Sequence, residues 1–184
     1  MTVGRAIARL KIKKHVARLL LRDANNLPSA NDIEVSRHNR FMLDTSVLIR
    51  HAQGNLSEHI LKLIETALLY QSSVCRSEIC IGLTNRDISR GTWKHEIEYW
   101  DDAFRAVPEK RVLCPDEQIW RDAGLITGSL TRTQGYQPHQ MKDVLNDSLI
   151  FLTAAKQGIP VLTANRGDFD LIQQIAKKGR FFWF

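Results

Sequence analysis

The chain has 184 residues, of which 43% are hydrophobic and 25% are charged, and its formal net charge is +6. This balance is typical of a folded domain and excludes disordered, fibrous and collagen-like proteins. The longest apolar runs are far shorter than the roughly 18 residues that a membrane-spanning helix needs, so no such helix is expected. Three cysteines without metal-ligand spacing, and a charged N-terminus that does not fit a secretory signal, predict buried thiols and a cytoplasmic location.

The positive charge is concentrated at the N-terminus. Residues 1–40 contain nine Lys or Arg and three Asp or Glu, whereas the rest of the chain is balanced. Apolar residues at helical spacing predict an amphipathic helix from about Ala6 to Arg22, followed by a polar linker. Such a helix can pack on its own domain, bind nucleic acid or an acidic partner, or bind an anionic membrane, and these alternatives stay open. The predicted division is a basic helix and linker over 1–40 and a main domain over 41–184.

Short apolar runs alternate with helical periodicity after Arg40, which predicts βα units around a parallel sheet. The predicted elements, in chain order, are a strand at 41–43, a helix at about 55–68, a strand at 73–75, a helix continuing through 78–81, helical apolar stripes at 93–104 and 119–130 separated by a strand at 112–114, a loop at 133–138, a helix at about 147–157, a strand at 160–163, a turn at 165–167, a helix at about 168–178 and a strand at 181–184. Both stripes are interpreted as core or interface surfaces. The predicted fold class is a three-layer α/β/α domain with a central parallel sheet, plus the N-terminal basic helical extension.

Four acidic residues stand at the ends of these elements. Asp44 follows the first strand, Glu78 lies a few residues after the second, Asp147 is placed in the first turn of a helix, and Asp168 follows the next strand by a turn. Because the carboxyl ends of parallel strands meet at one edge of a sheet, the four side chains are expected to converge. Unpaired carboxylates raise one another's pKa and need a cation, and Mg²⁺ or Mn²⁺ suits oxygen ligands. A bound ion of this kind supports phosphodiester hydrolysis.

Each acid also has a simpler explanation. Asp44, Asp147 and Asp168 stand where a helix N-cap or first-turn acid would, a position worth about 1 kcal/mol. If all of them act in this way, the chain is a non-catalytic RNA-binding or partner-binding module. Such a module binds RNA without added metal, whereas a nuclease of the type described above loses its activity in EDTA.

Four motifs, in order along the chain, resemble the PIN-domain family, and most closely the VapC-type ribonuclease toxins of toxin-antitoxin pairs. They are FMLDTSVLI at 41–49, SEICIG at 77–82, NDSLI to AA at 146–155 and VLTANRGDF at 161–169. The resemblance implies a parallel sheet flanked by helices, cleavage of RNA with Mg²⁺ or Mn²⁺, a homodimer and a small antitoxin as partner. Residues 1–40 are foreign to the family, so RNA contact, packing and a start-site artefact are all open explanations for them.

The resemblance also assigns roles to residues. Asp44, Asp147 and Asp168 are expected to hold metal directly or through water, and Glu78 to bind or position the attacking water. The residues expected to orient these carboxylates and their waters are Thr45, Ser46, Thr163 and Asn165. The candidate contacts to the RNA backbone are Arg166, which is preferred, and then Arg50, Arg76 and Lys142. The off-motif acids that lie close in sequence are Asp143 and Asp170. The predicted function is that of a metal-dependent endoribonuclease, the toxin of a type II toxin-antitoxin pair, without a membrane role.

Overall fold

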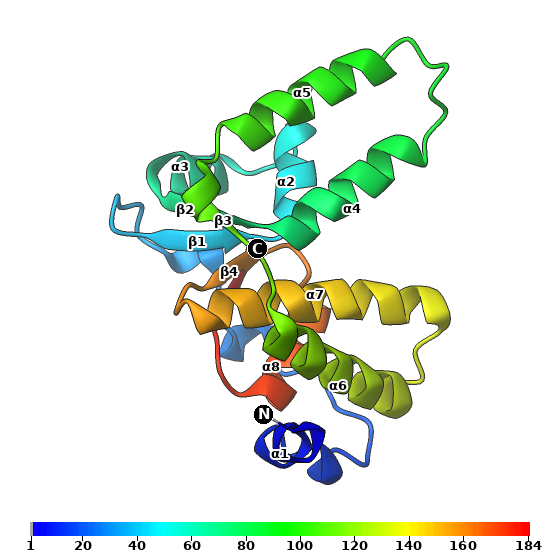
Figure 1. The fold of residues 1–184 in the computed structure, drawn as a ribbon. Coiled ribbons are helices and arrows are strands. Elements are labelled where there is room, and N and C mark those ends of the chain that lie inside the picture. Colours follow the sequence, from blue (N-terminus) through cyan, green and yellow to red (C-terminus); the bar gives the residue numbers. More distant parts are fainter. Residues whose placement is uncertain (1) are drawn as a thin grey trace.

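The computed structural model describes residues 2–184. A parallel five-stranded sheet in the order β3-β2-β1-β4-β5 forms its centre. The strands are β1 (Arg40–Leu43), β2 (Leu68–Ser72), β3 (Val112–Leu113), β4 (Val161–Thr163) and β5 (Phe181–Trp183). The α-helices are α1 (Val3–Arg9), α2 (Thr45–Ala52), α3 (Glu58–Thr66), α4 (Ser73–Thr84), α5 (Trp93–Arg105), α6 (Glu117–Gln134), α7 (Pro138–Lys156) and α8 (Arg166–Ala176). Helices α2 to α5 lie on one side of the sheet and α6 to α8 on the other (Figure 1), so the predicted fold class is confirmed.

The central strand β1 positions the functional edge of the sheet. Its residues Phe41, Met42 and Leu43 are all buried, as expected for a strand that is covered by helices on both faces. From β1 the chain adds β2 and β3 on one side and β4 and β5 on the other. The strand order therefore changes direction between β1 and β4, and a parallel α/β sheet binds its ligands at the carboxyl ends of the strands beside such a switch point.

Aromatic side chains form much of the core between the sheet and helices α7 and α8. The rings of Phe151 on α7, Phe169 on α8 and Phe181 on β5 are fully buried, with neighbouring centroids 6.1–6.2 Å apart. Gly179, in the turn before β5, has φ +91° and lies against this cluster. A Cβ atom at this position would lie 2.8 Å from the Ala155 Cβ and 2.9 Å from the Phe151 ring, so the turn requires glycine.

The apolar stripe at 119–130 is buried on α6, which confirms its interpretation as core. The stripe at 93–104 is only half-buried on α5, which projects from the body together with α4 (Figure 1). Among the cysteines, Cys75 is buried, whereas Cys80 and Cys114 are exposed, so the expectation of buried thiols is wrong for two of the three. None of the helices in residues 2–184 is both long and apolar enough to cross a membrane.

Several predicted element boundaries are wrong. Residues 73–75 begin α4 rather than forming a strand, because the Ser72 hydroxyl accepts a hydrogen bond from the Val74 N–H (3.2 Å) and caps the helix there. Helix α7 begins at Pro138, inside the segment predicted as a loop, because Gln137 and the first turn form a capping box. Asp147 therefore lies in the middle of a helix and not in its first turn, which removes its explanation as a first-turn acid.

The predicted N-terminal helix is wrong in its extent. Helix α1 ends at Arg9, Lys11 takes a left-handed backbone conformation, and the chain is irregular or in short 3-10 turns from there to β1. Leu10, Leu27 and Ala30 are buried against the main body, whereas Val16, Leu20 and Leu21 are exposed, so only part of the predicted apolar face packs on the domain. Packing on the rest of the chain is thus one role that the segment has.

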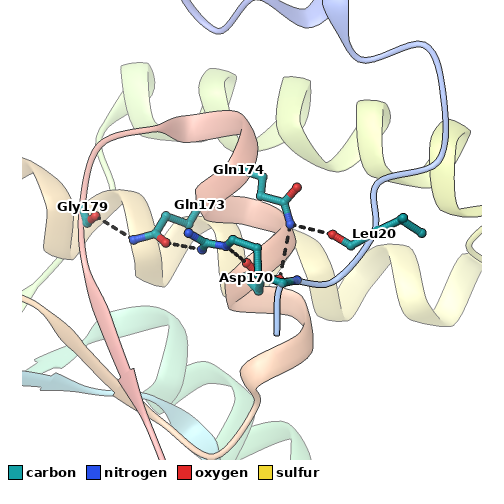
Figure 2. Close-up of polar contacts among 6 residues, drawn as sticks. Leu20, Asp170, Gln173, Gln174 and Gly179 are labelled. Carbon is teal, nitrogen blue, oxygen red and sulfur yellow. Dashed lines mark hydrogen bonds and ion pairs between the residues drawn. The ribbon is translucent and has the colours of Figure 1, made fainter. Parts of the chain in front are cut away.

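Ion pairs fasten the N-terminal segment to α6 and α8. Arg9 pairs with Asp122 of α6. Arg22 pairs with the fully buried Asp170 of α8, with an Nε–Oδ1 distance of 2.5 Å and a backbone N–H that donates to Oδ2 at 2.8 Å. Figure 2 shows the segment passing α8 at Asp170, with Gln174 of α8 donating to Asp170 and to the Leu20 carbonyl. Asp170 therefore holds the segment in place.

Candidate active site

The four predicted carboxylates come together at the carboxyl ends of β1 and β4. Asp44 directly follows β1, Glu78 lies on α4, Asp147 on α7 and Asp168 in the first turn of α8. Burial raises the pKa of Asp147 well above its ordinary value, and the negative charges of Asp44, Asp168 and Glu78 raise it further. Three carboxylates from other elements thus act on this one side chain, which places all four in a single site.

Asp44 points into this site rather than capping a helix. It stands at the N-cap position of α2, but its side chain makes no capping hydrogen bond. Its Oδ2 instead accepts hydrogen bonds from the hydroxyls of Ser46 (2.6 Å) and Thr163 (2.8 Å). Burial raises the pKa of Asp44, and these two hydrogen bonds oppose the rise. The explanation of Asp44 as a simple helix cap therefore does not describe this geometry.

One amide group holds two of the carboxylates side by side. The Nδ2 of Asn165, the N-cap residue of α8, donates to Oδ2 of Asp147 and to Oδ2 of Asp168, each at 2.9 Å. Its backbone N–H donates to the Thr163 hydroxyl at 2.8 Å, and that hydroxyl in turn donates to Asp44. Asn165 and Thr163 thus connect three of the four acids in one hydrogen-bonded network.

Glu78 has its own pair of donors. Its Oε2 accepts from the Thr45 hydroxyl (2.5 Å) and its Oε1 from the Asn146 amide (2.8 Å). Burial raises the pKa of Glu78, the two hydrogen bonds oppose this, and the nearby charge of Asp44 adds to the rise. Asn146 was not among the expected site residues, although it stands directly before Asp147 in the third motif.

Tyr136 is a second residue that the sequence did not indicate. Its hydroxyl donates to Oδ1 of Asp168 at 3.3 Å, from the short connection between α6 and α7. Burial, followed by the charge of Asp168, raises the pKa of Tyr136 to about 12, so the phenol stays protonated at neutral pH. No periodicity marks this position, since the tyrosine reaches the site only through the packing of α6 against α8.

The expected cations do not neutralise the acids. The guanidinium of Arg166 lies over the Trp183 ring, 5.2 Å from its centroid, and that of Arg50 lies over Phe184. Arg76 donates to the Gln71 side chain and to a backbone carbonyl of α5. Within residues 2–184, no Lys, Arg or His pairs with any of the four carboxylates. The cluster therefore carries an uncompensated negative charge.

A divalent cation fits this donor set. Carboxylate oxygens without a counter-ion are the ligands that Mg²⁺ and Mn²⁺ prefer. No three His, Cys, Asp or Glu side chains in the described part of the chain are already arranged to enclose an ion. Mg²⁺ usually takes only one or two carboxylates and keeps several waters, so the Asp147 and Asp168 pair suffices for direct ligation. Asp44 lies in the same hydrogen-bonded network.

Similarity to known proteins is found at two levels. A family model described as "PIN domain" matches residues 41–175. No curated protein matches the chain in sequence. Among solved structures, FitAcB from Neisseria gonorrhoeae is similar with 19% identity and a TM-score of 0.57, over 77% of this chain and 96% of that one.

Two further solved structures are similar, both of DNA-bound complexes. VapBC from Salmonella typhimurium has 23% identity and a TM-score of 0.53, over 78% of this chain and 96% of that one. VapBC2 from Rickettsia felis, bound to a promoter fragment, has 15% identity and a TM-score of 0.51, over 79% of this chain and 98% of that one. At these identities the likeness shows a shared fold. The family model adds that the match begins at the residue after Arg40.

Proposed function

The chain belongs to the PIN-domain family, and on that premise we propose that it is a metal-dependent endoribonuclease and the toxin of a type II toxin-antitoxin pair. The observation that carries the proposal is the group of four carboxylates from separate elements, three of them linked through Asn165 and Thr163, with no Lys, Arg or His counter-ion among residues 2–184. A purely structural set of helix caps would not need buried acids to face one another, because that arrangement is destabilising without a cation.

The proposed roles follow from the contacts of each side chain. Asp147 and Asp168 hold Mg²⁺ or Mn²⁺, with Asp44 binding directly or through water. The ion supplies polarisation of a phosphoryl oxygen and a lower pKa for a bound water. Glu78 has a raised pKa and accepts a proton from the attacking water, while Thr45 fixes its orientation.

Neighbouring groups keep the carboxylates in position. The Tyr136 hydroxyl donates to Asp168 and stays protonated, so it holds that carboxylate without competing for its charge. Ser46 and Thr163 donate to one oxygen of Asp44 and leave its other oxygen for ligation. Groups of this kind typically contribute 10–100-fold to metal affinity or activity.

An antitoxin is the proposed protein partner. The similar solved structures are toxin-antitoxin complexes, VapBC and FitAcB. In this chain, α4 and α5 project from the body, and a cavity of about 400 Å³ lies between α5 and α2, with Ile49 and Trp100 in its lining. Of the half-buried stripe on α5, Trp100 lines this cavity, beside Tyr99 and facing Ile49 of α2, and we propose that the antitoxin docks there. The resemblance also supports a homodimer as the assembly.

Cleavage of a mixed pool of single-stranded RNA and transfer RNA tests the nuclease proposal. Wild type, Asp44→Asn and Asp147→Asn are each incubated with Mg²⁺, Mn²⁺ or EDTA. Glu65→Gln serves as a matched control because Glu65 is an exposed acid near the end of α3, before β2 begins and so at the opposite end of the sheet from the site. We expect metal-dependent cleavage by the wild type and the control only. Cleavage that persists in EDTA, or folded proteins that are all inert, would favour the non-catalytic binding module.

A further inference from the structure

The N-terminal segment crosses the two helices that border the candidate active site. The carbonyl of His15 accepts a hydrogen bond from Arg132 near the end of α6 (2.8 Å), and the carbonyl of Leu20 accepts one from Gln174 on α8 (3.0 Å; Figure 2). Residues 16–19 therefore cross from the last turn of α6 to α8.

The same two helices carry the outer edge of the site. Tyr136 lies two residues beyond the end of α6 and donates to Asp168 in the first turn of α8. Residues 16–19 and the Tyr136–Asp168 hydrogen bond thus both connect the C-terminal end of α6 with α8. An arginine, Arg18, stands in the middle of the crossing segment.

Arg18 has no hydrogen-bond or ion-pair partner in the described part of the chain, residues 2–184. Arg9 and Arg22, the arginines on either side of it in sequence, are committed to Asp122 and Asp170. The Arg18 side chain is exposed and forms no ion pair or hydrogen bond with any residue from 2 to 184. A free guanidinium therefore stands in the stretch of chain that crosses between the two helices bordering Tyr136 and Asp168.

A second group of basic side chains continues this surface away from the site. Arg132 donates to the His15 carbonyl at 2.8 Å, and the pKa of His15 is lowered by burial and then by the charges of Lys177 and Arg132. Lys177 and Arg132 are exposed, and neither pairs with an acid among the described residues. Positive charge therefore extends from Arg18 to the C-terminal ends of α6 and α8.

We propose that Arg18 and the Arg132–Lys177 pair bind successive phosphates of an RNA strand as it leaves the carboxylate site, so that the N-terminal segment is a substrate-binding arm built onto the PIN domain. This inference rests on the proposed ribonuclease function. A negatively charged cluster repels the phosphates that flank the cleaved bond, and cations beside it reverse that repulsion. The family model begins after residue 40, so this arm lies outside it.

The test measures RNA binding rather than cleavage. In the Asp147→Asn background, which should leave the RNA intact, fluorescence anisotropy of a short labelled single-stranded RNA is followed over a range of salt concentrations. For single strands, each lost phosphate contact lowers the slope of log affinity against log salt by about 0.7. We expect this change for Arg18→Gln and for Lys177→Gln, and an unchanged slope for Arg18→Lys.

Arg37→Gln is the matched control. Arg37 is an exposed arginine of the same N-terminal segment without an ion pair in the described chain, but it precedes β1 and so lies at the opposite end of the sheet from the site. It should leave the slope unchanged. Since Arg18 is exposed and unpaired, Arg18→Gln should also keep the wild-type melting temperature, which separates loss of a contact from loss of structure.

The outcomes separate this inference from the proposed function. If the wild type cleaves RNA but Arg18→Gln and Lys177→Gln bind RNA with the parent's slope, the arm is refuted and the nuclease stands. If Arg37→Gln lowers the slope equally, the effect is general charge and the arm is also refuted. If oligoglutamate displaces the labelled RNA as effectively as unlabelled RNA of equal charge does, the surface is assigned to an acidic protein partner instead. Absence of both cleavage and RNA binding overturns both proposals.

Discussion

Replacing Asp147 by asparagine should stabilise the metal-free protein. The Asn165 amide holds an oxygen of Asp147 and one of Asp168 at 2.9 Å each, so the two oxygens are at most twice that distance apart. Two unit charges about 5 Å apart repel by about 3 kcal/mol at an effective dielectric constant of 20. Because Asp147 is partly relieved of this repulsion by binding a proton, we expect Asp147→Asn to raise the free energy of unfolding by about 1–3 kcal/mol in EDTA.

The gain should depend on pH in one direction. The pKa of Asp147 in the folded protein is raised above its ordinary value of 3.8. Its protonated form therefore stabilises the fold at low pH, and this contribution is lost as pH rises through the raised pKa. The stability difference between Asp147→Asn and wild type should be near zero around pH 4 and grow toward neutral pH.

Thermal and urea unfolding in EDTA across this pH range measure the effect. For a chain of this length, about 1–3 kcal/mol corresponds to a rise in melting temperature of about 2–12 °C. Asp170→Asn is the matched control, since Asp170 is also buried but is paired with Arg22, and its loss of charge should destabilise by about 1.5–3 kcal/mol. If both variants lose stability, or if the Asp147→Asn difference does not change with pH, the reasoning about like-charge repulsion is refuted.

Three further predictions concern other parts of the fold. Gly179→Ala should lower the free energy of unfolding by about 2–4 kcal/mol because the new Cβ would collide with side chains of α7. Gly54→Ala, where φ is also positive but the space is open, should lower it by only about 1 kcal/mol, and the urea midpoints of the two variants measure the difference. Thr163→Val removes a hydroxyl that donates to Asp44 and should lower the initial rate of metal-dependent cleavage by about 10–100-fold. Thr153→Val removes a hydroxyl that donates only to a backbone carbonyl of α7 and should leave that rate unchanged. The buried thiol of Cys75, whose pKa is raised mainly by burial, should react with a thiol reagent only on unfolding, while the two exposed cysteines react in the native protein.

The fold class and the meeting of the acids could be predicted because both follow from local patterns. Strands and helices alternate in the sequence, and the residue directly after a central strand of a parallel sheet must lie at its carboxyl end. Asp44 and Asp168 are placed in this way by the strands before them. The roles of the four acids in metal binding and catalysis stay a prediction that the proposed mutants test.

Other features depend on contacts that no local pattern records. Helix α7 starts at Pro138, and its capping box uses glutamines, which are weaker signals than the glycine and proline that predicted a loop there. Tyr136 becomes a site residue only because α6 packs against α8. The amphipathic pattern of the first 22 residues fits a helix. Arg9 and Arg22, however, pair with acids 113 and 148 residues away, and these ion pairs stabilise an irregular backbone conformation between them.

The bridge between Ser29 and Trp183 joins the first part of the chain to the last strand. It covers part of the open edge that β5 presents, and it also sets an order of events during synthesis. At ~5–20 residues per second, the partner of Ser29 is made ~8–30 s after it. Asp170 is made only 13 residues before Trp183, so for most of that time the basic segment lacks both of these partners and is open to proteases. Protection of residues 10–30 in full-length but not C-terminally shortened nascent chains would show this dependence.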